Sequence, residues 1–534
     1  MTLSEIEQLS RKHFPFPTPN PGQLEAIVSI VSNFLSGKTH VVVESPTGTG
    51  KSAIAITVHR VMDEIQNGFR SCIVTATKGL QSQYMETNPE LVNMMGKENY
   101  SCPYNAGPYS SAKCKQTQGM GTCFKALKCP YYLARKDWME SSLRLTNTSF
   151  QLSAPHVICA KRDENRADLI VLDECHELDD QIVEHATINL TPERFGTDSY
   201  FDVVKGVIRE FINIFIDKSK GYAFVPDEEI IKEVSVVCGM LQGMKTELET
   251  AIKTRPKNCK TESTRLGLLE EFGDSVSFLL GKGEWIINEI EHGESMVIKP
   301  VYPSEVSDYV VFSKADKFLH MSATICGYED YIRSLGIEAD SSVFIEVDNP
   351  IPVQQRKVIF LPKVRVSKNY DIDYIVKIID TICDRYSGKN GVIHTVSFKL
   401  ANEIIERSKH RKIMFVSNDK TEIMARMEKG NSILLSPSVE KGYDFKGELA
   451  RFQVVAKTPY LFLGDELIKY KARVDHEWYS RKAILRVVQA SGRGVRGVND
   501  YADTYIIDSN FEQLVKRYHE IFPIWFLESL KVVR

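Results

Sequence analysis

Short apolar runs that each end in a loop of small or polar residues most constrain the fold of this 534-residue chain. Four to six apolar residues, many of them β-branched, followed by such a loop and a helical segment are typical of buried parallel strands in βα units. Eight runs fit this description: HVVVESPTGTGKS, SCIVTATKG, ADLIVLDECHE, NGVIHTVSF, KIMFVSN, NSILLSPS, FQVVAKTP and DTYIIDS. The sequence therefore predicts an α/β fold with ligands at the carboxyl ends of the strands.

The runs form two groups, separated by the NPIP stretch at Asn349–Pro352, which we interpret as a linker. Two tandem doubly wound parallel-sheet domains follow from this grouping. Two segments interrupt the first domain: one is rich in cysteine, and the other carries apolar residues at helical spacing as far as GEWIINEIE. The predicted organisation is first domain 1–95, 145–195 and 295–350; cysteine segment 96–144; helical insertion 196–294; second domain 351–534.

Bulk properties exclude a membrane protein and favour reduced cysteines. No apolar run approaches the roughly 18 residues that a membrane span needs, and MTLSEIEQLSRKHF lacks the apolar core of a signal peptide. We therefore expect an intracellular protein, in the cytoplasm or nucleoid of a prokaryotic or viral source or in a eukaryotic nucleus. Its eleven cysteines should be thiols or metal ligands.

A glycine-rich loop, Gly48-Thr49-Gly50-Lys51-Ser52, follows the predicted strand His40–Val43 and precedes a helical segment. Glycines allow backbone N–H groups to approach phosphates, and the start of a helix adds positive potential. Lys51 would then reach the β- and γ-phosphates of ATP, while Ser52 would hold Mg²⁺. Ser45 stands where the full phosphate-loop pattern has its first glycine.

Two acidic residues, Asp173 and Glu174, end the predicted strand Leu169–Leu172. A carboxylate at a strand tip beside a phosphate loop can bind Mg²⁺, the role predicted for Asp173. Glu174 is then placed to polarise the attacking water. An acidic strand end taken alone is usually a helix cap, so the prediction depends on Lys51 upstream.

An arginine segment in the second domain reads Gln489-Ala490-Ser491-Gly492-Arg493-Gly494-Val495-Arg496. Two arginines three residues apart would face one side of a helical turn. Guanidinium groups that reach the γ-phosphate from another domain neutralise charge that develops during phosphoryl transfer. The alternatives are a solvated basic helix face and arginines that hold DNA phosphates.

Four cysteines, Cys102, Cys114, Cys123 and Cys129, lie within 28 residues with the spacing C-x11-C-x8-C-x5-C. Four thiolates suit either zinc or an iron–sulfur cluster. Structural zinc sites mostly use C-x₂₋₄-C pairs, and none of these intervals is that short, which disfavours zinc.

Basic and aromatic residues are interleaved around these cysteines. Between Gly96 and Glu140 there are seven Lys or Arg against three Asp or Glu, in a chain whose net charge is −3. Cations that follow phosphates and rings that stack on bases are what a single-strand binding surface needs. The alternative is a solvated loop whose rings pack around the metal. The rings are Tyr100, Tyr104, Tyr109, Phe124, Tyr131, Tyr132 and Trp138.

Taken together, these residues resemble the XPD/DinG family of superfamily 2 iron–sulfur DNA helicases, in motif order over nearly the whole chain. Ser45 matches the helicase form of the phosphate loop, and CPYYLAR from Cys129 resembles the segment at the family's last cluster cysteine. Lys441 stands where the family usually has glutamate. Further matching motifs are Pro21-Gly22-Gln23 (adenine-sensing), Thr75–Lys78 with Gln81 (DNA-contacting), Met321–Thr324 (coupling of the two domains), Thr395–Phe398 and Gly442–Phe445.

The resemblance implies two RecA-like motor domains, the first interrupted by a 4Fe–4S cluster domain and a helical arch. It also implies a monomer that binds single-stranded and forked DNA, translocates 5′→3′ along the single strand and unwinds the duplex. Two rivals stay open: a DNA-stimulated translocase without processive unwinding, and a redox-gated DNA-binding regulator. The residues that would bind ATP and Mg²⁺ are Gln23, Ser45, Pro46, Thr47, Gly48, Thr49, Gly50, Lys51, Ser52, Asp173 and Asp444. The catalytic residues would be Lys51, Asp173, Glu174, Gln489, Arg493 and Arg496. The four clustered cysteines would hold the metal cluster.

Overall fold

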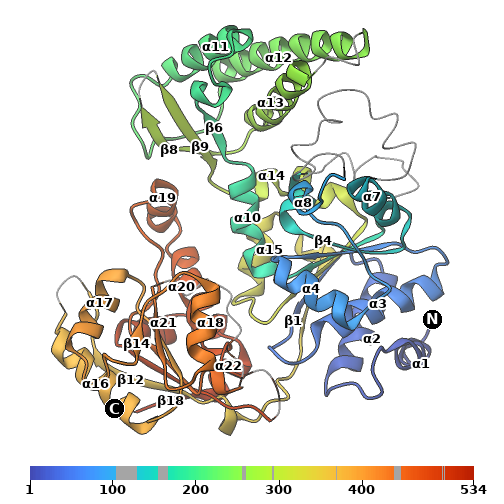
Figure 1. Cartoon of the computed structure of the whole chain (residues 1–534). Coiled ribbons are helices and arrows are strands. Elements are labelled where there is room, and N and C mark those ends of the chain that lie inside the picture. The colour runs from blue at the N-terminus through green and yellow to red at the C-terminus, as the bar shows by residue number, and fades with distance from the viewer. Residues whose placement is uncertain are drawn as a thin grey trace.

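The chain folds into two α/β domains and an insertion that rises from the first of them (Figure 1). The structure is a computed structural model that describes residues 1–103, 129–153, 166–254, 260–291, 294–367, 370–437, 445, 447–495, 497 and 499–533, with the side chains at 253, 260 and 263 left out. None of the helices in these ranges combines the length and the hydropathy that crossing a membrane requires.

The first domain is built on a seven-stranded sheet in the order β11-β1-β10-β5-β2-β4-β3, and its strand pairs are parallel. Successive residues of β1 face opposite sides: Val42 belongs to one hydrophobic core, and Val41 and Val43 to the other. Helices therefore cover both faces, as a doubly wound fold requires. The strands are β1 His40–Glu44, β2 Ser71–Thr75, β3 Val92–Asn93, β4 Leu143–Asn147, β5 Leu169–Asp173, β10 Lys317–Ser322 and β11 Ser342–Glu346; the helices are α1 Leu3–His13, α2 Gln23–Leu35, α3 Lys51–Ile65, α4 Lys78–Thr87, α7 Pro130–Glu140, α8 Thr148–Ser153, α10 Leu178–His185, α14 Ser304–Val310 and α15 Tyr328–Leu335.

The second domain repeats this design with the strand order β14-β15-β13-β16-β17-β12-β18, again with parallel pairs. All eight apolar runs form strands, three in the first sheet and five in the second, so the predicted fold class is confirmed. The strands are β12 Val358–Val364, β13 Gly391–His394, β14 Met414–Phe415, β15 Ile433–Ser436, β16 Phe452–Val455, β17 Asp503–Asp508 and β18 Leu530–Val532; the helices are α16 Ile372–Arg385, α17 Phe398–Arg407, α18 Lys420–Glu428, α19 Glu466–Val474, α20 His476–Ser491, α21 Asn510–Arg517 and α22 Ile524–Ser529.

The insertion contains long helices, but it stands on an antiparallel sheet that the sequence reading missed. The helices are α11 Asp202–Asn213, α12 Glu228–Thr254 and α13 Lys260–Ser277. The sheet has the order β6-β9-β8-β7, with β6 Ile188–Leu190, β7 Ala223–Phe224, β8 Trp285–Glu291 and β9 Ser295–Pro300. The prediction of helix as far as Glu291 was wrong.

The physical reason lies in the sequence around β8. Gly281 and Gly283 interrupt the apolar spacing of α13, and glycine within a helix is unfavourable. Trp285, Ile286 and Ile287 are all buried, because both faces of this part of the strand are covered. A run of consecutive apolar residues does not distinguish a buried strand from a buried helix.

Candidate nucleotide site between the two domains

The phosphate loop lies between β1 and α3, the strand–loop–helix context that the sequence led us to expect. Gly48 and Gly50 have φ angles of 85° and 84°, a left-handed conformation that glycine adopts at little cost. The loop is closed on itself by the hydroxyls of Ser45 and Thr49, 2.5 Å apart, and by a 2.7 Å bond from Thr49 Oγ1 to the Pro46 carbonyl. Its backbone N–H groups and the start of α3 therefore form a preformed site for an anion.

Gln23 fastens this loop to α2. Its Nε2 donates to the carbonyls of Thr49 (2.7 Å) and Gly50 (3.1 Å), and its Oε1 accepts from the Asn20 N–H at 2.6 Å. The side chain is 2% exposed. In this state the amide that the resemblance assigns to adenine sensing supports the phosphate loop.

The acidic pair at the end of β5 faces Lys51. Lys51 Nζ lies 3.4 Å from Glu174 Oε1, and the Tyr84 hydroxyl donates to Asp173 Oδ2 at 3.1 Å. Burial, and then the charge of Glu174, raise the pKa of Asp173 to about 6 against the opposing charge of Lys51. A divalent cation would favour the ionised form of such a buried carboxyl, so the group fits a Mg²⁺ ligand. Ser52, in the first turn of α3, is half-buried beside Lys51.

Glu174 is held in an unusual backbone conformation, with a φ of 56°. His176 Nδ1 lies 3.4 Å from Glu174 Oε2 and 2.7 Å from the Ser322 hydroxyl. The Ser45 N–H donates to the Ser322 carbonyl at 2.8 Å. The loops after β1, β5 and β10 thus meet at Ser322, which connects the phosphate loop to the acidic pair.

The arginine segment of the second domain reaches the phosphate loop. Thr47 Oγ1 donates to the carbonyls of Gly492 (3.3 Å) and Val495 (3.4 Å). Gln489 lies half-buried in the last turn of α20, and Arg493 follows the helix end, beside His394. Burial and the charge of Arg493 lower the pKa of His394 to about 4.

The structure corrects our prediction that the arginine segment is helical. We expected a helical turn through both arginines, but α20 ends at Ser491 and the segment continues as a glycine-containing turn. Arg496 and Asp444 lie outside the described residues.

A second contact between the domains, which the sequence analysis did not foresee, is a buried ionic cluster. Lys482 Nζ lies 2.9 Å from carboxylate oxygens of both Asp179 and Asp180, and Arg481 lies 3.8 Å from Asp179. Burial raises the pKa of Asp179, but the charges of Lys482 and Arg481 outweigh it and hold that pKa below its usual value. Burial also lowers the pKa of the neighbouring Lys471 to about 8. Charged residues on an otherwise apolar helix are the signal that could have marked this contact.

The cysteine segment is described only at its two ends. Cys102 and Cys129 are free thiols, and Cys129, 8% exposed, immediately precedes α7. The rings of Tyr100 and Tyr131 pack edge to face with centroids 5.5 Å apart, so the two cysteines leave the first domain at neighbouring points. Cys114 and Cys123 lie outside the described residues, and the described part of the chain holds no group of three or more metal-ligating side chains.

Several residues expected to meet nucleic acid have internal roles instead. Trp138 is fully buried and donates to the Leu145 carbonyl at 2.9 Å, and Tyr131 is 7% exposed. Gln81, 1% exposed, donates to Asn93 and the Met94 carbonyl and accepts from Asn147. These side chains hold the edge of the first sheet together. Tyr104, Tyr109 and Phe124 lie outside the described residues.

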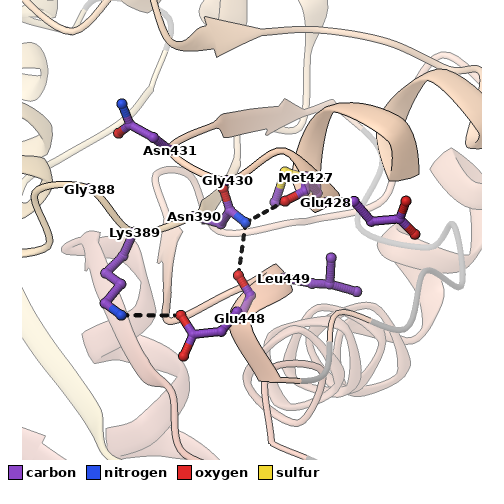
Figure 2. A pocket seen from close by; sticks show the side chains of 9 residues that line it. All are labelled: Gly388, Lys389, Asn390, Met427, Glu428, Gly430, Asn431, Glu448 and Leu449. Carbon is purple, nitrogen blue, oxygen red and sulfur yellow. Dashed lines mark hydrogen bonds and ion pairs between the residues drawn. The ribbon is translucent and has the colours of Figure 1, made fainter.

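A pocket of about 270 Å³ in the second domain lies away from this site (Figure 2). Asn390 spans it, donating to the carbonyls of Met427 (2.6 Å) and Glu448 (2.8 Å), and Lys389 pairs with Glu448 at 3.2 Å. Asn390 immediately precedes β13, so the pocket lies at the amino ends of the strands. Ligands of doubly wound sheets bind at the opposite edge.

Two family models match separate parts of the chain. Residues 16–204 match the family model described as "Type III restriction enzyme, res subunit", and residues 379–529 match "Helicase C-terminal domain". A probable ATP-dependent helicase of Methanocaldococcus jannaschii is 22% identical, over 96% of this chain and 95% of that protein.

Solved structures share the fold. One titled as an XPD helicase superposes with a TM-score of 0.63 at 15% identity, covering 97% of this chain and all of that one. The S. tokodaii Xpd4 structure gives 0.57 at 16% identity, covering 96% and 99%. The first matched model contains the phosphate loop and the second contains the arginine segment. The structure brings these two segments into contact.

Proposed function

We propose that this chain, an XPD-like superfamily 2 helicase, hydrolyses ATP between its two motor domains in order to translocate 5′→3′ along single-stranded DNA and unwind duplex DNA. The observation that carries the proposal is the hydrogen-bonded contact between Thr47 of the phosphate loop and the arginine segment at Gly492 and Val495. ATP bound at Lys51 would therefore lie where both domains can act on it. The direction of translocation rests on the family resemblance.

Each residue of the first motor domain has a role that follows from its position. The phosphate-loop N–H groups and Lys51 bind the phosphates, and Ser52 and Asp173 would hold Mg²⁺, which neutralises the charge that develops on them. Glu174, next to Asp173 and 3.4 Å from Lys51, orients and polarises the attacking water. Because Lys51 pairs with Glu174 here, arriving phosphates would compete for Lys51 and free the carboxylate for water.

The second motor domain supplies cations. Arg493 and Arg496 are the candidate fingers that stabilise the transition state, and Gln489 precedes them in the same segment of the sequence. A finger from a second domain makes hydrolysis depend on closure of the cleft, which is how ATP turnover becomes motion.

Exposed rings on the second domain support contact with nucleic acid. Phe398 follows the carboxyl end of β13 and is 51% exposed; Phe462 follows β16 and is 80% exposed. β13 and β16 are hydrogen-bonded neighbours, so both rings come from one edge of the sheet. Aromatic side chains in such positions can stack on successive bases of a single strand.

The two described cysteines of the quartet support the proposal that the four hold a 4Fe–4S cluster. Cys102 and Cys129 leave the domain together, and both are free thiols. When bound, the cluster would fix the segment between them as a rigid part of the strand-separating surface.

Metal analysis tests the cluster separately from the motor. Protein kept from oxygen should be brown, with about four iron per chain. Cys129→Ser should lose the cluster and the ability to unwind yet retain measurable ATPase. A colourless protein with stoichiometric zinc that still unwinds would contradict the iron–sulfur assignment.

Forked duplexes with either a 5′ or a 3′ single-stranded tail test the function itself. We expect hydrolysis that single-stranded DNA stimulates, and displacement on the 5′-tailed substrate. Displacement only on the 3′-tailed substrate would mean that the protein translocates 3′→5′. Stimulated hydrolysis without displacement would indicate a translocase, and DNA affinity set by cluster state with dispensable ATPase would indicate a redox-gated regulator.

A further inference from the structure

Glu44, the last residue of β1, is a buried carboxylate that no motif includes. It immediately precedes the phosphate loop and is 3% exposed. Its Oε2 accepts hydrogen bonds from the backbone N–H groups of Ile325 (2.5 Å) and Cys326 (3.4 Å). Burying a carboxylate is costly unless it is hydrogen-bonded, so this residue needs a structural or functional reason.

The loop that Glu44 holds enters the second domain. Cys326 is fully buried, and it packs in a cluster whose other buried members, among them Val358, Ile484 and Phe526, all belong to the second domain. A Cβ built on Gly327 would lie 3.5 Å from Ile521 and 3.7 Å from Arg481, also of the second domain. The loop after β10 is therefore a plug from the first domain in the core of the second.

The plug has a strained backbone. Cys326 has a φ of 53°, a left-handed conformation that a residue with a Cβ rarely adopts. Such strain persists only where the surroundings fix it. Here Glu44 fixes the two N–H groups on one side, and the second domain encloses the side chain on the other.

We propose that Glu44 is a positioning residue that holds the Ile325–Gly327 plug in the second domain and so transmits changes in the phosphate loop across the domain interface. The adjacent Ser45 N–H donates to the carbonyl of Ser322, the last residue of β10 before the plug, which gives two parallel links between the loops. This inference rests on the proposed function and adds to it the residue that carries the coupling.

The chemistry of the contact requires reach and an acceptor oxygen. Glu44→Gln keeps an oxygen at the same place. Glu44→Asp keeps the charge but withdraws the oxygen by about 1.5 Å, which takes it beyond hydrogen-bonding distance of the plug. Burial raises the pKa of Glu44 to about 7, so the neutral amide resembles the form that burial favours.

The rate of thiol labelling at Cys326, located by peptide mass analysis, measures how often the plug opens and needs no assay of activity. We expect labelling at least about tenfold faster in Glu44→Asp and Glu44→Ala than in the wild type, because the plug then opens, and a rate within about twofold in Glu44→Gln. Glu329→Asp, the same shortening at an exposed site three residues beyond Cys326, is the control and should label like the wild type. Unchanged labelling in Glu44→Asp overturns the proposal.

Kinetics separate positioning from mere folding. In Glu44→Asp the KM for ATP should stay within about twofold while the kcat stimulated by single-stranded DNA falls at least about tenfold. In Glu44→Gln both the KM and the kcat should stay near the wild-type values. If Glu44→Asp keeps full stimulation, Glu44 does not couple the domains. A wild-type protein that lacks stimulated hydrolysis would instead defeat the proposed function, while the labelling result would still decide whether Glu44 holds the plug.

Discussion

Two of the contacts between the two α/β domains differ in strength. At the cleft, Thr47 makes two hydrogen bonds longer than 3.2 Å, and Lys51 and Glu174 remain 13% and 25% exposed. At the buried contact, Lys482 and Asp179 are 3% and 8% exposed and 2.9 Å apart. A typical hydrogen bond contributes about 1 kcal/mol, whereas removing one partner of a buried ion pair costs about 3–5 kcal/mol. Under the proposed function, ATP would therefore alter the cleft readily while the buried contact holds the domains together.

Asp179→Ala should have the largest effect on stability. It leaves Lys482 and Arg481 buried without their shared partner, so we expect a loss of about 3–5 kcal/mol in the free energy of unfolding, measured by urea denaturation. Asp180→Ala is the matched control, because Asp180 pairs with the same lysine at the same 2.9 Å but is 65% exposed. That variant should lose about 1 kcal/mol or less. Equal losses would mean that the cluster is no stronger than a surface pair.

Lys51→Ala and Glu174→Gln should leave the buried contact intact but each reduce the kcat for ATP by about 10²–10³-fold, because both groups act on charge that develops in the transition state. Glu174→Gln should still bind ATP, as nucleotide binding assays can show, since its loss affects the water and not the phosphates. Near-normal hydrolysis by Glu174→Gln would reject the assignment of that residue.

A pH series that compares the wild type with Glu44→Gln tests whether Glu44 is buried as its contact with the plug requires. Burial, and then the charge of Glu346, raise the pKa of Glu44 from 4.5 to about 7, so the folded state binds a proton that the unfolded state releases. The stability of the wild type relative to Glu44→Gln should therefore fall as the pH rises from about 4.5 to 7, by at most about 3 kcal/mol, and level off above. A difference independent of pH would mean that Glu44 is not buried as described.

Thr47→Ala should have the smallest effect. Losing its bonds to the second domain removes about 1 kcal/mol from the closed cleft, or about fivefold in ATP hydrolysis. Thr47→Ser keeps the hydroxyl and should behave as the wild type. If Thr47→Ala is as inactive as Lys51→Ala, the hydroxyl acts on ATP itself rather than on domain contact.

The cleft and the buried contact also differ in how far the sequence predicted them. Lys51, Asp173 and Glu174 were predictable because each follows an apolar strand, and parallel strands bring such ends to one edge. The eight strands themselves were predictable because each is a short apolar run that ends in a loop of small or polar residues. By contrast, β4 (Leu143–Asn147) and β10 (Lys317–Ser322) carry polar residues within the strand and were missed, although both are almost wholly buried.

The contacts between domains could not be predicted from local pattern. Asp179 and Lys482 are 303 residues apart, and each looks like an ordinary charged residue on a helix until the fold brings them together. Glu44 likewise precedes a recognisable loop without belonging to its motif. Trp138 misled us in the opposite sense, because a ring among basic residues indicates a binding surface unless the fold buries it.

Hydrogen exchange on the Glu174→Gln protein, with and without ATP and Mg²⁺, tests the comparison most directly. Exchange should slow in the phosphate loop Ser45–Ser52 and in the arginine segment Gln489–Val495, where nucleotide closes the cleft. It should not change in α10 or in Trp478–Arg486 of α20, where the ionic cluster persists. Equal changes at both contacts, or none at the cleft, would contradict an ATP-controlled cleft beside a permanent buried contact.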